Sequence, residues 1–230
     1  MKADVPLESR YEIKFSASEL YRDRVEQWLL TNRAGFRTAF PARWVNNLYF
    51  DSFDYDAVWE NLVGVSARTK VRYRWYGELS RAGPGAIELK CKRNLFGWKR
   101  IHPLDEGLCL DSKPWREIYA DLRERTPEDL QCHLDAHPQV VLINRYRRKY
   151  FVSGDGRIRA TVDWKQAVWD QRCNPFPNLG RPANMPNAMV LEIKCDRADR
   201  ELASRIVQSL PIRVGRHSKY VVGVRAIAGG

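Results

Sequence analysis

The sequence predicts an α+β fold built on a mainly antiparallel sheet of about eight strands, with helices packed on it. Two observations predict this fold. Several segments alternate charged and apolar residues with a period of two, which is typical of strands with one buried face. Segments with apolar residues at helical spacing separate some of these strands, and turn signals such as RAGPG and NLFG separate others. Because no repeat or linker interrupts the chain, we expect one domain over residues 1–230.

The N-terminal half is expected to contain most of the strands. The first one alternates Tyr11, Ile13 and Phe15 with charged neighbours. Ser16 and Glu19 have the spacing of a capping box, so a helix should follow. Strands are predicted at Arg10–Ser16, Trp44–Asp51, Ala67–Tyr76, Ala86–Arg93 and Gly97–Pro103. Helices are predicted from about Ser18 to Asn32, and around Ala57, Val58 and Leu62 with an end at Gly64.

The C-terminal half is expected to alternate helices, strands and one long loop. Thr126 is a predicted cap for a helix that starts with Pro127. The predicted helices are Lys113–Glu124, Pro127–Ala136 and Asp199–Leu210. The predicted strands are Gln139–Val152, Arg157–Trp169 and Ala188–Asp196, with a Pro/Asn/Gly-rich loop at Cys173–Asn187 and a closing segment at Ser218–Ile227.

The composition predicts an anionic partner for a soluble protein. Lys and Arg number 39 against 28 Asp and Glu, which gives a formal net charge of +11. Nucleic acid, an anionic membrane and phosphate-rich small molecules all remain open on this ground. No apolar run is long enough for a spanning helix, and the start MKADVPLESR has no signal-peptide core, so we expect a cytoplasmic location. The five cysteines and four histidines show no zinc spacing or nucleophile motif.

Charged residues share one face of several predicted strands. Arg72 and Arg74 share a face with Arg68 and Lys70, because residues i and i+2 of a strand point the same way. The same alternation recurs in three more segments, with Glu88, Lys90 and Lys92, with Arg157, Arg159, Thr161, Asp163 and Lys165, and with Glu192, Lys194 and Asp196. A solvated outer face would explain such a pattern. Like charges on neighbouring strands are destabilising, however, so a bound anion is the alternative explanation.

A closed sheet would turn these charged faces into the lining of a tunnel. The apolar faces could then pack beneath the helices, while Arg and Lys focus a positive potential on a threaded polyanion. Carboxylates such as Glu12 and Glu192 among these cations are suitable ligands for Mg²⁺ or Mn²⁺, which bind one or two carboxylates together with substrate phosphates.

Eight segments, in order along the chain, resemble the VTC (vacuolar transporter chaperone) domain, the polyphosphate polymerase module of the triphosphate tunnel metalloenzyme superfamily. They are RYEIKF (10–15), NNLYFDS (46–52), KVRYRWYG (70–77), IELKCKR (87–93), RYRRKYF (145–151), RIRATVDW (157–164), LEIKCD (191–196) and HSKYVVGV (217–224). The resemblance implies a mainly antiparallel β-barrel, a tunnel of about eight strands with helices packed outside, that binds a nucleoside triphosphate and inorganic polyphosphate.

The resemblance also assigns roles to residues. It implies catalytic roles for Arg72, Arg74, Lys90 and Arg159. It implies phosphate binding by Lys14, Lys99, Arg148 and Lys219, to which the alternation adds Lys194. Glu192, with Glu12, is the expected ligand of Mn²⁺ or Mg²⁺. Hydrolytic tunnel enzymes open with Glu-x-Glu-x-Lys, whereas this chain has Arg10 at the first position and keeps only Glu12 and Lys14.

These observations favour a metal-dependent polyphosphate polymerase. A triphosphate or tripolyphosphate hydrolase on the same tunnel and a non-catalytic polyphosphate-binding module remain alternatives. We expect no nucleic-acid partner, because duplex DNA is too wide for a barrel of eight strands. We expect no membrane span in this chain, which leaves room for a membrane-associated partner.

Overall fold

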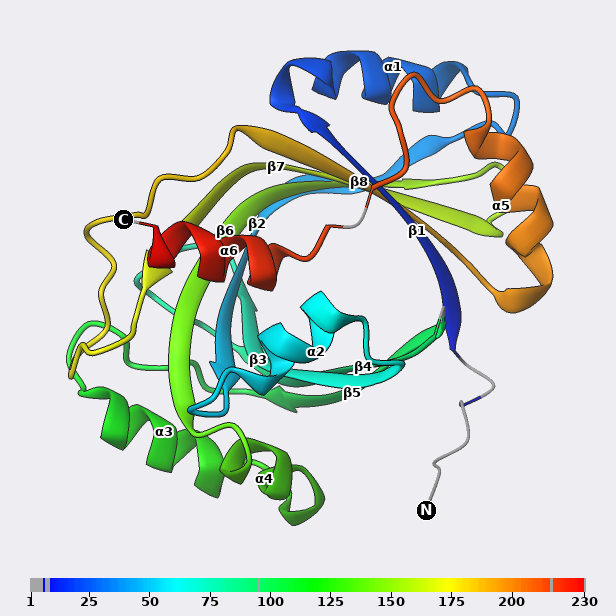
Figure 1. Ribbon diagram of the computed structural model, residues 1–230. Helices are drawn as coiled ribbons and strands as arrows, with labels where there is room; N and C mark the ends of the chain where they lie inside the picture. The colour runs from blue at the N-terminus through cyan, green and yellow to red at the C-terminus, as the bar shows by residue number, and fades with distance from the viewer. Residues whose placement is uncertain (1–5, 7–8, 95, 216, 230) are drawn as a thin grey trace.

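The computed structural model describes residues 6, 9–94, 96–215 and 217–229. Eight strands close into an antiparallel barrel in the order β1-β5-β4-β3-β2-β6-β7-β8 (Figure 1). This architecture confirms the predicted α+β fold. Most of the stretch 1–8, from which the absence of a signal peptide was predicted, and Leu95 of the turn NLFG lie outside the described residues.

The elements of the described chain alternate along the sequence much as predicted. The strands are β1 (Arg10–Ser18), β2 (Arg37–Asp51), β3 (Ala67–Tyr76), β4 (Gly85–Arg93), β5 (Phe96–Leu104), β6 (Gln139–Val152), β7 (Ile158–Asp170) and β8 (Ala188–Cys195). The α-helices are α1 (Arg22–Thr31), α2 (Asp56–Val63), α3 (Trp115–Glu124), α4 (Glu128–Asp135), α5 (Arg200–Val207) and α6 (Lys219–Ala228). Two short 3-10 helices, η1 (Glu19–Tyr21) and η2 (Arg197–Asp199), precede α1 and α5.

The hydrophobic core lies between the outside of the barrel and the helices. Val71, Tyr73 and Leu89 pack in a cluster with buried residues of α3 and α4, on one side of the barrel. Leu191 and Ile193 pack in a second cluster with α1 and α5, which lie on the other side in Figure 1. Burial of each such side chain stabilises the fold by about 1.5–3 kcal/mol. Apolar packing on the outside leaves the charged faces of the strands to line the inside, here called the lumen.

A third cluster lies at one end of the barrel, where α6 packs against β6, β7 and α2. Figure 1 shows α6 and α2 across the end of the barrel that faces the viewer. Tyr220 of α6 is buried, stacks on Tyr49 at 4.8 Å between ring centroids, and donates a hydrogen bond of 2.6 Å from Oη to Asp51. We call this the α6 end. The predicted closing segment is therefore a helix that anchors its first residues inside the barrel.

Two expected boundaries in the first half are wrong. β2 begins at Arg37 rather than Trp44, and its first residues pair with β6 through two register shifts around Pro41. Pairing with a distant strand, rather than local alternation, makes this part a strand. The capping serine is Ser18, whose Oγ accepts from the amide of Leu20, whereas Ser16 stays in β1.

Two expectations in the second half also need correction. Thr126 does not cap α4. Its hydroxyl donates to the carbonyl of Leu122 at 2.7 Å, at the end of α3. Lys165 leaves the charged face of β7 because it adopts a left-handed backbone conformation (φ 50°) at a register shift and is exposed. Arg157 also lies outside the lumen, where it pairs with Asp199.

Candidate functional site: a basic tunnel

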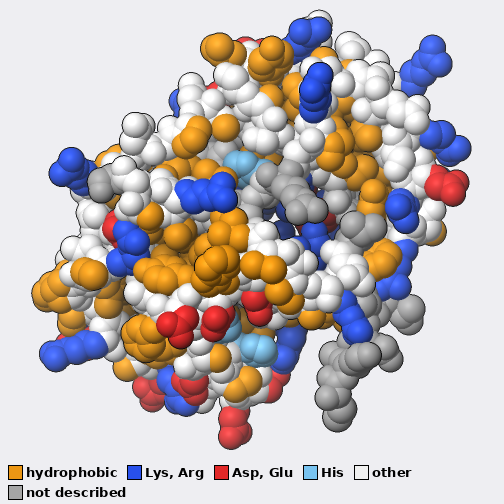
Figure 2. All heavy atoms as spheres, viewed as in Figure 1, with side chains coloured by type: hydrophobic (Ala, Val, Ile, Leu, Met, Phe, Trp, Pro, Cys, Tyr) orange, Lys and Arg blue, Asp and Glu red, His pale blue; other side chains and the backbone are white. Residues whose placement is uncertain are grey.

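The lumen contains an excess of positive charge in the described part of the chain. Its ion pairs and hydrogen bonds join nine cations, namely Lys14, Lys70, Arg72, Arg74, Lys90, Lys99, Arg148, Lys194 and Lys219. Four carboxylates accompany them: Glu12, Glu88, Asp163 and Glu192. Figure 2 shows basic side chains inside the hollow beside α6. Because the cations outnumber the carboxylates, the lumen is electropositive.

Glu88 and two arginines form the first cluster. Arg72 donates to Glu88 Oε2 through Nε at 2.8 Å and also through Nη2, and Arg74 Nη1 reaches Oε1 at 3.3 Å. Lys99 adds a contact of 3.4 Å from Nζ. Although burial alone would raise the pKa of Glu88, the two guanidinium groups hold it far below its usual value. Glu88 therefore stays ionised and orients both arginines.

Glu12 and Glu192 form a second cluster in which the cations close to them are lysines. Lys14 Nζ lies 3.2 Å from Glu12 and 2.8 Å from Glu192, so it bridges the two carboxylates. Lys194 contacts Glu192 at 2.8 Å, and Lys90 lies 3.6 Å from Glu12. Burial opposes ionisation of Glu192, but Lys14 and Lys194 keep its pKa well below the usual range.

Asp163 anchors a third cluster between β6, β7 and α6. Arg148 donates to both of its oxygens, at 2.6 and 2.7 Å, and Lys219 Nζ lies 2.6 Å from Oδ2. Burial raises the pKa of Asp163, yet these cations bring it to about 2. In β6, Arg145 and Arg147 lie over Trp44 outside the lumen, and Lys149 pairs with Glu26. Of the four basic residues in this strand, only Arg148 joins the lumen clusters.

Comparison with known proteins agrees with this geometry. The VTC domain profile matches residues 10–228, which is nearly the whole chain. The chain belongs to the VTC domain family. A search of curated proteins found no match.

Two solved structures share the fold of this VTC domain. A putative adenylyl cyclase from Hippeastrum, described as having a dominant triphosphatase activity, superposes with a TM-score of 0.56 at 13% identity and covers 94% of this chain and 95% of that chain. A putative adenylate cyclase from Vibrio parahaemolyticus superposes with a TM-score of 0.50 at 9% identity, over 92% of this chain and 97% of that chain. At these identities the likeness shows the fold.

The structure brings together every expected site residue of the VTC domain except Arg159. This arginine points to the same face of β7 as Asp163 but lies near the end of the strand, where it is exposed and has Arg10 and Asp196 as its charged neighbours. Arg159 therefore lies opposite Lys194 at the end of the barrel, outside the ion pairs that join the other expected residues. The alternation placed its face correctly, but its position along the barrel depends on how the strands are staggered.

Several polar lumen residues were missed by sequence analysis. Asn47 accepts from Arg74 Nε at 2.8 Å and donates to Asn144 at 2.7 Å. Tyr49 accepts from Arg72 Nη1 at 3.1 Å, and Tyr146 lies 3.4 Å from Arg74 Nη2. The sequence carried a signal for two of them, because Asn47 and Tyr49 alternate with apolar residues of β2 and so share the face opposite these apolar residues. These groups fix the arginines from the side opposite Glu88.

Three lysines of the lumen are poorly compensated. Glu12 raises the pKa of Lys90, but Lys14 and burial together lower it to about 7. Burial and the neighbouring Arg72 and Arg74 lower the pKa of Lys99 to about 6, although Glu88 opposes the change. Burial and nearby cations lower the pKa of Lys70 to about 7, and its Nζ donates to Ser218 at 2.8 Å. A phosphate oxygen beside any of these lysines would favour its charged form. These lysines lack sufficient negative charge around them in the free protein, and a bound anion would supply it.

Glu12 and Glu192 suit a divalent metal better than the other lumen carboxylates. No group of three or more His, Cys, Asp or Glu side chains in the described residues is placed to hold a metal ion. Two carboxylates joined by one lysine do not form a complete cage. They do match the way Mg²⁺ and Mn²⁺ bind beside phosphates, with one or two carboxylates and the remaining ligands from water and substrate. The residues therefore fit a metal that arrives with its phosphate ligand.

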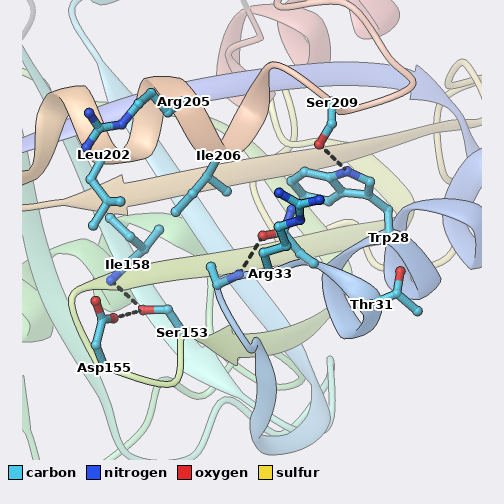
Figure 3. Close-up of a pocket in the computed structure, with 12 residues that line it drawn as sticks. Trp28, Thr31, Arg33, Ser153, Asp155, Ile158, Leu202, Arg205, Ile206 and Ser209 are labelled. Atoms are coloured by element: carbon cyan, nitrogen blue, oxygen red, sulfur yellow. Dashed lines mark hydrogen bonds between the residues drawn. The ribbon is translucent and has the colours of Figure 1, made fainter.

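A separate pocket of about 510 Å³ lies outside the barrel between α1 and α5 (Figure 3). Trp28 donates to Ser209 at 3.1 Å across it, and Leu202 and Ile206 of α5 also line it. None of the lumen cations lines this pocket. It is thus a gap between two outer helices, distinct from the tunnel.

In the described residues, no helix has the length and apolar character needed to cross a membrane.

Proposed function

We propose that this VTC domain is a metal-dependent polyphosphate polymerase that transfers the terminal phosphoryl group of a nucleoside triphosphate to inorganic polyphosphate. The observation that carries the proposal is the excess of cations among the described lumen residues, nine against four carboxylates in the contacts given above. The chain matches the VTC profile over residues 10–228. A threaded polyphosphate would supply the negative charge that this lumen lacks.

The transfer requires positioned charge rather than a protein nucleophile. A terminal oxygen of the polyphosphate attacks the γ-phosphorus, the bond from this phosphorus to the bridging oxygen breaks, and a nucleoside diphosphate leaves. Arg72 and Arg74, whose forks Glu88 orients, would stabilise charge on the transferring and leaving phosphates. Lys90, Lys99 and Arg148 would bind further phosphate oxygens in line with them.

Glu12 and Glu192 would hold Mn²⁺ or Mg²⁺ in this proposal. When bound, the metal would neutralise charge on the phosphate oxygens. Lys14 then has a second role, because it bridges the two carboxylates in the free protein. Burial raises the pKa of both carboxylates, but Lys90 lowers that of Glu12 most strongly, and Lys14 that of Glu192. With a metal held by the two carboxylates, the Lys14 ammonium would be free to bind phosphate.

Hydrolysis on the same tunnel is the second candidate function. It is supported by the triphosphatase activity ascribed to the Hippeastrum protein, which shares the fold. Polymerisation is favoured by Arg10, which replaces the first glutamate of the hydrolytic pattern and leaves two carboxylates beside Lys14. A non-catalytic polyphosphate-binding module is the third candidate, and it would share the lumen cations without turnover.

Incubation of the purified protein with ATP and Mn²⁺ tests these functions directly. Long polyphosphate, resolved from free phosphate on a gel, is the expected product. Free phosphate alone would identify a hydrolase, and binding without turnover would identify a binding module. Thermal unfolding tests separately whether the protein binds polyphosphate or nucleic acid. Tripolyphosphate should raise the Tm in a salt-dependent way and duplex DNA should not, and tighter binding of DNA would contradict the tunnel.

The cytoplasmic location stays a prediction.

A further inference from the structure

A cluster of aromatic residues and one arginine lies at the end of the barrel away from α6. Arg43 places its guanidinium 3.9 Å from the ring centroid of Tyr76 and 5.0 Å from that of Tyr150, and its Nε donates to Tyr150 Oη at 3.1 Å. Phe40 packs edge-on against Tyr150 at 5.8 Å. We call these four residues the aromatic mouth. The clusters described above use none of them.

The strand register places the aromatic mouth directly beyond the phosphate-binding arginines. Tyr76 follows Arg74 by two residues in β3, and Tyr150 follows Arg148 by two residues in β6, so each pair shares a face. Arg43 is paired with Arg148 across β2 and β6. Two residues of a strand span about 7 Å, roughly the step from a nucleotide's first phosphate across its ribose to the base.

The aromatic mouth offers free ring surface, which the α6 end of the lumen does not. Tyr76 is 42% exposed and Phe40 is 62% exposed, although both contact other side chains of the cluster. At the α6 end, Tyr49 is only 5% exposed because it stacks on Tyr220. Exposed rings beside a fixed guanidinium suit a flat, partly polar ligand.

We propose that the aromatic mouth binds the base of the nucleoside triphosphate by stacking. The nucleotide then enters base-outward, with its first phosphate near Arg74 and Arg148 and its terminal phosphate deeper in the lumen, toward Glu12 and Glu192. This orientation leaves the α6 end, where Lys70 donates to Ser218, for the polyphosphate chain. Because stacking tolerates different bases, ATP and GTP are expected to bind with similar affinity. The inference rests on the proposed function, since it requires a nucleotide in the tunnel.

The test compares two ligands that share a triphosphate, of which only one has a base. The variant is Tyr76→Leu, which removes a ring without changing charge. Its matched control is Trp44→Leu, because Trp44 is also covered by an arginine, Arg145 at 4.1 Å, but lies outside the lumen. Dissociation constants for ATP and for tripolyphosphate are measured by calorimetry without metal, so that no turnover occurs.

We expect Tyr76→Leu to weaken ATP binding about tenfold, the lower part of the range for loss of one stacked base, and to leave tripolyphosphate binding within about twofold. Retained tripolyphosphate binding shows that the variant is folded. Trp44→Leu should change neither constant. The base subsite is wrong, while the tunnel function stands, if Tyr76→Leu leaves ATP binding intact or weakens both ligands equally. If the unmodified protein binds neither ligand, the proposed function fails together with the subsite.

Discussion

Glu88 and Glu192 lie in the same lumen and are similarly buried, at 4% and 6% exposure, but they are held by different cations. Glu88 accepts from the planar forks of Arg72 and Arg74, which are themselves buried and tied to Asn47 and Tyr49. Glu192 contacts the ammonium groups of Lys14 and Lys194, whose side chains remain 25% and 19% exposed to the lumen. One carboxylate is locked in place, and the other is held by groups that can move.

The difference separates a positioning carboxylate from an exchangeable one. An arginine keeps its charge under all ordinary conditions and binds in a fixed geometry, whereas a lysine turns freely about its stem and can lose its proton. A metal ion could therefore replace Lys14 beside Glu192 without leaving a buried cation stranded. The same replacement at Glu88 would strand two arginines. Lysine-held carboxylates are thus the ones available to a metal.

The largest expected effect is on turnover in the variant Glu192→Gln. This change keeps the shape of the side chain and removes the anion that would bind the metal, so we expect metal-dependent phosphoryl transfer to fall about 1000-fold. Tripolyphosphate should still bind, because the lumen cations remain. Activity is measured as product formed with Mn²⁺, and binding by calorimetry. Near-normal activity would reduce Glu192 to an ion-pair partner of Lys14 and Lys194.

The variant Glu88→Gln should lose stability instead. Breaking a buried ion pair strands its partners, here Arg72 and Arg74, and typically lowers the free energy of unfolding by about 3–5 kcal/mol. Glu192→Gln should lose less than about 2 kcal/mol, because Lys14 keeps Glu12 as a partner and Lys194 can turn toward lumen water. Urea unfolding of both variants measures the two losses. Equal losses would show that the distinction between arginine and lysine partners has no energetic consequence.

A conservative exchange in each cluster tests the same distinction with a smaller expected loss of stability. Arg72→Lys removes the two-point contact with Glu88 and the bond to Tyr49, so the free energy of unfolding should fall by about 1–2 kcal/mol. Lys194→Arg should change it by less than about 0.5 kcal/mol, since no fixed geometry is lost at this partly exposed position. If both exchanges were tolerated equally well, the arginine fork would not be what fixes Glu88.

The smallest effect concerns pH. In the folded protein the pKa of Lys99 is about 6 and that of Lys70 about 7, whereas the ordinary value of a lysine is near 10.5. Between the lowered and the ordinary pKa, the unfolded chain therefore binds more protons than the folded protein. Stability should therefore rise as the pH increases from about 6 to 9. Tripolyphosphate restores these protons, so the Tm increase that it causes should shrink over the same range. Tm measured with and without tripolyphosphate tests this, and a pH-independent increase would contradict it.

The sequence by itself determined which charged residues of the regular strands β3, β4 and β8 face the lumen. A period of two in β3, β4 and β8 separates Arg72, Lys90 and Glu192 from the apolar neighbours that pack beneath the helices. The resemblance to the VTC domain identified the family and added Arg148 and Lys219, which alternation alone did not place in the tunnel. Side-chain direction is a local property of a regular strand, so the sequence was sufficient for these three strands but not for Lys165, where β7 is irregular.

Only the tertiary structure decided which of these residues meet. Arg159 shares the face of Asp163 but lies at the end of the barrel, since strand stagger sets the height of each residue and depends on all eight strands together. The locked state of Glu88, the lysine bridge between Glu12 and Glu192, and the aromatic mouth likewise join residues distant in the chain. Ion pairing and stacking depend on distances across the lumen, which appear only once the barrel closes.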